Sequence, residues 1–69
     1  MNVVPLQSSN LASYQYDPTA QELYISFKNG GRYKYTGVPQ DVADGLGEAS
    51  SPGSYFQSDI KGSYGYSKA

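Results

Sequence analysis

Three cations and a tyrosine in one alternating segment are the residues best suited to bind a ligand. Lys28, Arg32 and Lys34 are three of the five Lys and Arg residues, and positions 23–38 carry no acid. Alternate residues of a strand share one face of a sheet, which places these cations with Tyr24. Sheet faces that combine cations with an aromatic ring occur in several RNA-binding domains. We therefore predict a surface for RNA or another anionic partner. With one later cation added, its candidate residues are Tyr24, Lys28, Arg32, Lys34 and Lys61.

The same residues also fit a solvated sheet face that binds nothing. Three cations would release few counterions compared with a protein that makes roughly 6–10 phosphate contacts. Lys and Arg side chains on a strand also discourage pairing between exposed sheet edges. Both interpretations stay open at the level of the sequence.

The composition excludes most catalytic chemistry. The chain has no Cys and no His, so it lacks a thiolate nucleophile, a zinc knuckle, the commonest general base and the commonest metal ligand. The acids Asp41, Asp44 and Glu48 have no apolar flank that would raise a carboxyl pKa. Ser8 and Ser9 have no nearby base that would make either a nucleophile. We expect a protein that is not an enzyme and that uses no cofactor and no metal.

The length and charge predict a small domain without a membrane segment. The chain has 69 residues and a net charge of -1, which suits one domain over residues 1–69 and argues against a polybasic arm. No apolar run approaches the roughly 20 residues that cross a bilayer, and Met1–Gln7 lacks a signal-peptide pattern. We therefore expect a soluble, cytoplasmic protein. Its eight tyrosines, against two Phe and no Trp, should mostly form the wall of the core.

Three segments alternate with the period of a strand. They are residues 11–16, 22–28 and 32–36. Leu23, Ile25 and Phe27 should face an apolar side, and their neighbours a wet side. In the first segment, Ala12, Tyr14 and Tyr16 share one face, and Leu11, Ser13 and Gln15 share the other.

The turn sequences predict which residues pair across the hairpins. Residues 17–21 have turn composition, and a four-residue loop there pairs Asp17 with Glu22. In the second hairpin, a loop of Asn29–Gly31 with a left-handed Gly31 keeps every apolar residue on one face. The further predicted pairs are Tyr16 with Leu23, Lys28 with Arg32, Phe27 with Tyr33 and Ile25 with Tyr35.

The period changes to that of a helix after the third strand. Pro39 suits a first helical turn, and the apolar stripe is Val42, Leu46 and Ala49. The glycines at positions 45 and 47 weaken this helix by about 1 kcal/mol each relative to Ala, so it needs tertiary packing.

A second helix and a tail complete the chain. Ser51 can cap this helix with Pro52 in its first turn. Phe56 and Ile60 lie four residues apart on its inner face, and Gly62 ends it. Strands followed by helices predict an α+β fold. We expect a three-stranded antiparallel β-meander packed on one face by two short helices, and leave open an added N-terminal strand near Val3.

The order of these segments resembles the KTSC domain family. The family takes its name from an extra domain at the C-terminus of some lysyl-tRNA synthetases, and it includes free-standing bacterial and phage proteins. The segments that carry the resemblance are Ser8-Ser9-Asn10, Tyr16-Asp17-Pro18, Leu23–Phe27, Tyr33-Lys34-Tyr35, Gly37-Val38-Pro39, Gly53-Ser54-Tyr55-Phe56, Ile60-Lys61 and Tyr64-Gly65-Tyr66.

The resemblance implies a single compact domain and no known activity. RNA binding is implied only by the association with the synthetase. Family members often have arginines near the closing tyrosines, whereas this chain offers only Lys61 and Lys68 there, which weakens the nucleic-acid interpretation.

Two other functions fit the sequence. A protein-interaction accessory or regulator suits the near-neutral charge and the tyrosine content, and exposed tyrosines gathered in one patch would favour it. The third function is capture of a small nucleotide between the subunits of an oligomer.

Overall fold

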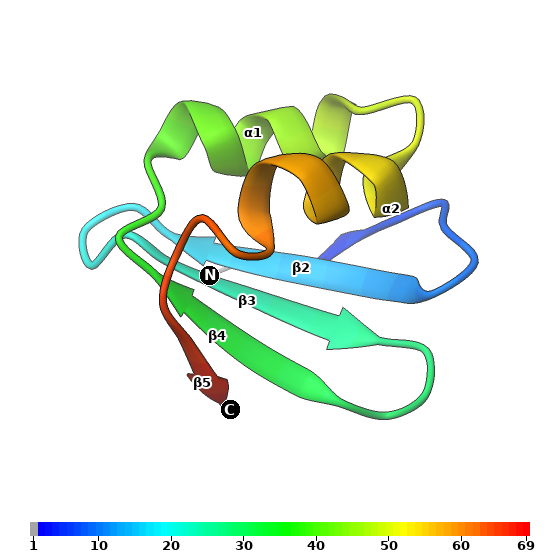
Figure 1. Cartoon of the computed structure of the whole chain (residues 1–69), viewed down its shortest axis with the longest axis horizontal. Helices are drawn as coiled ribbons and strands as arrows, with labels where there is room; N and C mark the ends of the chain where they lie inside the picture. Colours follow the sequence, from blue (N-terminus) through cyan, green and yellow to red (C-terminus); the bar gives the residue numbers. More distant parts are fainter. Residues whose placement is uncertain (1) are drawn as a thin grey trace.

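An antiparallel sheet with two short helices on one face makes up the protein (Figure 1). The computed structural model describes residues 2–69. The strands are β1 (Val4–Pro5), β2 (Leu11–Asp17), β3 (Glu22–Phe27), β4 (Arg32–Thr36) and β5 (Tyr66–Lys68). The helices are α1 (Gln40–Glu48) and α2 (Pro52–Tyr55), and α2 continues into a π-helical turn, η1 (Phe56–Ile60). The predicted α+β class is confirmed, but the described chain forms five strands.

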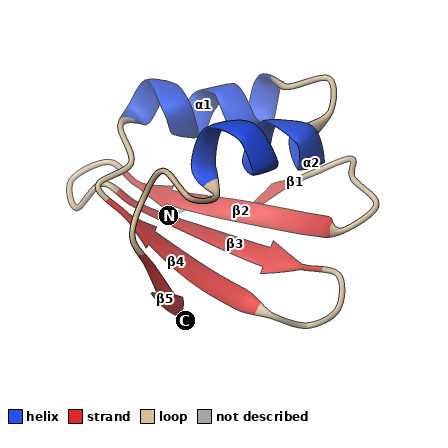
Figure 2. Ribbon diagram, viewed as in Figure 1, coloured by secondary structure: helices blue, strands red, loops and turns tan. Residues whose placement is uncertain are grey.

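The two strands outside the predicted meander lie at its edges. The strands follow chain order from β1 to β5 across the sheet, and Figure 2 shows both helices on the same side of it. The added N-terminal strand is present, with Val4 paired to Tyr14. The prediction that the chain ends in a tail after the second helix is wrong, because Tyr66 pairs with Tyr35 of β4 and belongs to a fifth strand. Such a short strand has no pattern of its own and forms against the open edge of β4.

The first hairpin has the predicted register. Asp17 pairs with Glu22 and Tyr16 with Leu23. Asp17 Oδ1 accepts the backbone N–H groups of Thr19 at 3.0 Å and Ala20 at 3.3 Å, which holds the turn. At the other end of β2, the register shifts between Leu11 and Ser13.

This bulge corrects the predicted face of Leu11. The extra residue of a bulge shifts the alternation by one position. Leu11 therefore pairs with Phe27, is fully buried, and joins Tyr14 on the side that carries the helices.

The second hairpin has the predicted faces but a different register. Ile25 pairs with Tyr33 and Leu23 with Tyr35, so the predicted pairs are displaced by two residues. The predicted pair of Lys28 with Arg32 is also wrong, since Arg32 lies opposite Ser26. A shift of two keeps every side chain on its face, so the apolar pattern cannot detect it. The turn itself begins one residue earlier, and the glycine with positive φ is Gly30 (98°) instead of Gly31.

The first helix packs on the sheet through a different set of residues from the predicted stripe. In α1 the buried residues are Ala43 and Leu46, whereas Val42 and Ala49 are half-buried. Pro39 precedes the helix in an extended conformation.

The second helix buries the two predicted residues. Phe56 and Ile60 lie on its inner face. Pro52 occupies the first turn as predicted. The Ser51 hydroxyl bonds to the Ser54 hydroxyl at 3.0 Å and does not cap the backbone.

The core fills the space between the sheet and the helices, and most tyrosines belong to its wall as predicted. Tyr14 and Tyr35 are buried within it, and four others pack against it. These four are Tyr16, Tyr33, Tyr55 and Tyr64. Within residues 2–69, no helix has the length and hydropathy needed to cross a membrane.

Candidate functional site

Tyr24, Arg32 and Lys34 lie together on the sheet face that points away from the helices. We call this face the outer face. Tyr24 pairs with Lys34 on one side and with Gln15 on the other. The Arg32 guanidinium lies over the Tyr24 ring, with Cζ 5.1 Å from the ring centroid. Arg32 Nη2 also donates to Gln15 Oε1 at 2.6 Å. The ring and the amide therefore hold the guanidinium in place on the face.

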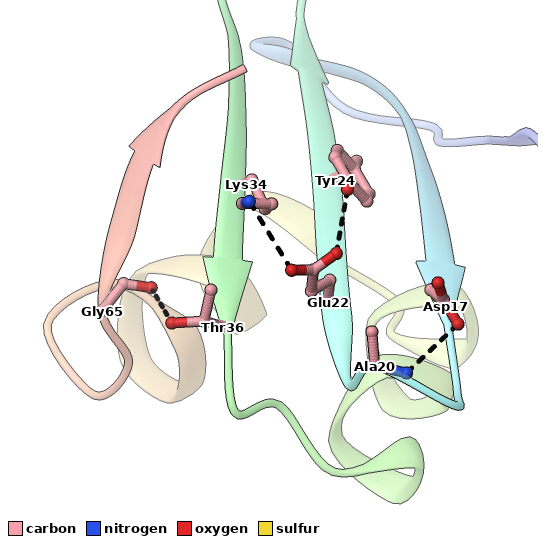
Figure 3. Close-up of polar contacts among 7 residues, drawn as sticks. All are labelled: Asp17, Ala20, Glu22, Tyr24, Lys34, Thr36 and Gly65. Atoms are coloured by element: carbon pink, nitrogen blue, oxygen red, sulfur yellow. Dashed lines mark hydrogen bonds and ion pairs between the residues drawn. The ribbon is translucent and has the colours of Figure 1, made fainter.

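Glu22 also belongs to this group. It was not predicted because the acid-free segment that indicated the candidate face, residues 23–38, begins one residue after Glu22. Its Oε2 is 3.5 Å from Lys34 Nζ, and its Oε1 accepts a 3.0 Å hydrogen bond from the Tyr24 hydroxyl (Figure 3). This hydrogen bond is the main reason that the pKa of Tyr24 is raised. The signal was available in the sequence, because residues 22 and 24 share a face of the same strand.

The negative charges of the acids on the outer face balance the positive charges of its cations. Asp17 lies opposite Glu22, so two carboxylates accompany Arg32 and Lys34 on this sheet. An exposed ion pair such as Lys34 with Glu22 contributes about 0–1 kcal/mol to stability. The face is therefore a polar network with balanced charge and not the purely cationic surface that the segment 23–38 indicated.

The other two predicted cations lie apart from the outer-face network. Lys28 is exposed in the turn between β3 and β4, where its backbone N–H donates to Asn10 O at 2.9 Å. Lys61 follows η1 and lines a pocket on the side of the sheet that carries the helices. The predicted set is thus divided between two faces of the sheet.

Four of the five cations nevertheless come from neighbouring parts of the sheet. Lys28, Arg32 and Lys34 lie on the β3–β4 hairpin or its turn, and Lys68 lies on β5. The acids of α1 gather near β2 instead. Burial raises the pKa of Tyr14, and Asp44 and Glu48 raise it further. The hairpin and β5 therefore carry four of the five cations of a chain whose net charge is -1, and Glu22 of β3 lies among them.

A pocket lined by aromatic rings opens beside β4 and β5. Its volume is about 310 Å³. The rings that line it are Phe27, Tyr33, Tyr35, Phe56 and Tyr66. Phe27 stands nearly perpendicular to Tyr33, at 85° with centroids 5.8 Å apart. Burial is the main cause of the raised pKa of Tyr35.

Polar side chains border the same pocket. Asn10, Gln57 and Lys61 supply two amides and one ammonium group. Tyr66 is 66% exposed. The other tyrosines of residues 2–69 are buried or half-buried. A patch of several exposed tyrosines is therefore absent from residues 2–69. Sequence reasoning included Lys61 but missed the pocket, because its walls come from segments far apart in the chain.

A second groove is lined by hydroxyl and amide groups. It lies between the β1–β2 connection and the start of α2, and its volume is about 830 Å³. Ser8 Oγ donates to Asn10 Oδ1 at 2.9 Å and accepts the Leu11 N–H at 3.2 Å. Gly53 lies so close that a Cβ there would be 3.2 Å from Asn10 Oδ1. These bonds order the loop, and no charged residue lines the described groove.

No metal site accompanies these surfaces in the described chain. Among residues 2–69 there is no group of three His, Cys, Asp or Glu side chains that could hold a metal ion.

Comparison with known proteins gives one family. The model of the KTSC domain matches residues 7–64. An uncharacterized protein of Stutzerimonas stutzeri is 44% identical over 61 residues, which are 88% of this chain and 86% of that protein. A lysine–tRNA ligase of Nostoc sp. is 40% identical over 60 residues, which are 87% of this chain but 11% of the ligase. The crystal structure of a KTSC domain protein from Yersinia pestis matches with a TM-score of 0.94 and 35% identity, covering 99% of this chain and 96% of that one.

Proposed function

Because the chain belongs to the KTSC domain family, a small domain whose function is uncharacterised, we propose that it is a non-catalytic module that binds single-stranded RNA. The proposed surface, which we call the basic hairpin surface, consists of Tyr24, Lys28, Arg32 and Lys34 on the β3–β4 hairpin and its turn. Lys61, which lies on the other side of the sheet, would extend this surface. The observation that carries the proposal is that Lys28, Arg32 and Lys34 come from one hairpin, where the Arg32 guanidinium lies over the Tyr24 ring. A nearly neutral protein can bind a polyanion when its cations are concentrated on one side.

The relatives support an RNA partner. The lysine–tRNA ligases that the chain resembles act on tRNA by name, and the matched segment is 11% of the Nostoc ligase. A domain joined to such an enzyme is well placed to contact its RNA. The proposal concerns this segment alone, because the matched segment is only a small part of each ligase.

The number of cations limits the strength of binding. Three or four phosphate contacts would give a slope of about −2 to −3 in a plot of log affinity against log salt for a single strand. Affinity should therefore be modest at physiological salt and should fall steeply as salt is added.

Fluorescence anisotropy with a short labelled single-stranded RNA tests the proposal. Arg32→Gln should weaken binding and reduce the salt slope by about 0.7, the value for one lost phosphate contact. Gln40→Glu is the matched control, because it lowers the net charge by the same amount on α1. RNA binding that does not depend on salt, or that both variants weaken equally, would contradict a specific basic hairpin surface.

Removing the acid on the outer face gives a test in the opposite direction. Glu22→Gln releases Lys34 from its ion pair and should raise RNA affinity by roughly 2- to 5-fold, equivalent to a surface pair of about 0.4–1 kcal/mol. Glu48→Gln makes the same chemical change on α1 and should have a smaller effect. An equal gain in both variants would show that net charge alone controls binding.

A further inference from the structure

The aromatic pocket lies on the opposite side of the sheet from the outer-face network. Tyr35 and Tyr66 form a cross-strand pair between β4 and β5, and both line the pocket. Lys34, between Tyr33 and Tyr35 in β4, points to the other face. A ligand in the pocket would therefore use a different set of side chains from the outer-face group Tyr24, Arg32 and Lys34.

The pocket is built to receive a flat ring. Tyr35 and Tyr66 are tilted by 31° with centroids 5.6 Å apart, while Phe56 meets Tyr35 edge-on at 81°. Aromatic walls in these orientations offer both ring faces and ring edges to a ligand. The volume of about 310 Å³ is at the lower end of the range for small-molecule pockets, about 300–1,000 Å³. It suits one ring system with a single substituent.

The polar border selects among flat ligands. Gln57 carries a hydrogen-bond donor and an acceptor. Asn10 Oδ1 already accepts from Ser8 Oγ, so Asn10 contributes its amide NH2 as a donor. Both amides can pair with the polar edge of a nitrogen heterocycle. Lys61 follows Gln57 by four residues, and both line the pocket. Its ammonium group forms no ion pair with any residue in 2–69. An anionic substituent on the ring would supply the missing partner.

We propose that this pocket binds a nitrogen-containing aromatic ring that carries an anionic group, of the class represented by a nucleoside monophosphate. The ring contacts Tyr33 and Tyr66, the two amides bond to its polar edge, and Lys61 contacts the phosphate. The ligand comes either as a free nucleotide or as one nucleotide of an RNA strand. The proposal does not depend on the outer-face residues Arg32 and Lys34.

An NMR titration of backbone amide signals with AMP tests the pocket. The signals of Gln57, Lys61 and Tyr66 should shift on adding AMP. Adenosine lacks the phosphate of AMP, and ribose 5-phosphate lacks its base. Each should bind about 10-fold more weakly than AMP, because each loses one set of contacts. Equal affinity for all three probes, or no shifts with millimolar AMP, would overturn the proposal.

Two variants separate the ring contact from the phosphate contact. Lys61→Gln should weaken AMP binding by about 10-fold and leave adenosine binding unchanged, since it removes one charge-assisted contact. Gln40→Glu is the matched control, because it lowers the net charge by the same amount on α1, and it should leave AMP binding unchanged. Tyr66→Ser should weaken both AMP and adenosine, with circular dichroism to verify that the exposed strand β5 does not disrupt the fold. An equal loss of AMP binding in the Gln40→Glu variant would overturn the assignment.

Arg32→Gln distinguishes this site from the proposed RNA surface. The variant should weaken RNA binding and leave AMP binding unchanged. If AMP binds while RNA does not, the free nucleotide is the ligand and the pocket stands without the RNA function. If Tyr66→Ser weakens both AMP and RNA binding, the RNA strand supplies the nucleotide. If RNA binds but AMP fails to shift the pocket signals, the pocket proposal is wrong and the RNA function stands.

Discussion

Gly45 of α1 lies against the phenol ring of Tyr55, and a Cβ at position 45 would approach Tyr55 Cζ to 2.8 Å. The ring is held there because the Tyr55 hydroxyl donates to Val42 O at 2.7 Å. Gly47 has the same relation to Tyr14, with a distance of 3.3 Å from the Cβ position to the ring atom Cζ. The two glycines that weaken the helix therefore make room for the tyrosines that dock it.

Gly45→Ala should destabilise the protein although Ala is the better helix former. The clash with Tyr55 should cost about 1–3 kcal/mol, which exceeds the gain of about 1 kcal/mol in helix propensity. Urea denaturation followed by circular dichroism measures the difference. In a Tyr55→Leu background the same substitution should be neutral or stabilising. An equal loss in both backgrounds would contradict the close packing of the ring.

Tyr16→Phe should lower stability through the loss of one hydrogen bond. The Tyr16 hydroxyl donates to Val38 O at 2.5 Å, and Val38 is fully buried in the connection between β4 and α1. Leaving that carbonyl without its partner should cost about 1–3 kcal/mol of unfolding free energy. Tyr64→Phe is the control, because Tyr64 also packs against the core but its hydroxyl has no hydrogen bond to residues 2–69. Thermal unfolding that places both variants within about 0.5 kcal/mol of the wild type would refute the role of Tyr16.

The protein should lose stability at alkaline pH. The pKa values of Tyr14, Tyr16, Tyr35 and Tyr55 are raised above 10.0, chiefly by burial. That of Tyr24 is raised mainly by its bond to Glu22. Above pH 10 the unfolded chain loses phenolic protons that the folded chain keeps, so the unfolding free energy falls as pH rises. Below about pH 9 these tyrosines contribute no pH dependence.

Denaturation midpoints measured from neutral to strongly alkaline pH test this expectation. Tyrosinate absorbance of the folded protein provides the matching titration, in which Tyr14, Tyr16, Tyr35 and Tyr55 should ionise above pH 10.0. A titration centred at 10.0, with a constant denaturation midpoint up to that pH, would show that burial leaves the phenols unperturbed.

The alternation of the strands was enough to predict the two sides of the sheet. Leu23 and Ile25 are fully buried, while Tyr24 and Arg32 meet on the outer face. The buried pair Phe56 and Ile60 followed equally from its spacing. These predictions hold because side-chain direction along a strand or helix depends only on local backbone geometry.

The candidate site was less predictable than the fold. Tyr24, Arg32 and Lys34 come together as the alternation predicted, but Glu22 pairs with Lys34 across the strands. No pattern in the sequence indicated strand β5, which has only three residues. The position of Tyr66 could therefore not be predicted. The aromatic pocket joins Phe27 to Tyr66, which are 39 positions apart in the sequence.

The amino-acid sequence by itself determined the class of fold, the face on which each residue of β3 and β4 lies, and the absence of Cys and His chemistry. Tertiary structure decided the two-residue displacement of the β3–β4 register, the bulge that turned Leu11 inward and the docking of β5 on β4. The physical reason is that local periodicity fixes only the direction of a side chain. Its neighbours across the sheet depend on which backbone groups pair, and that pairing is settled when the whole chain closes around its core.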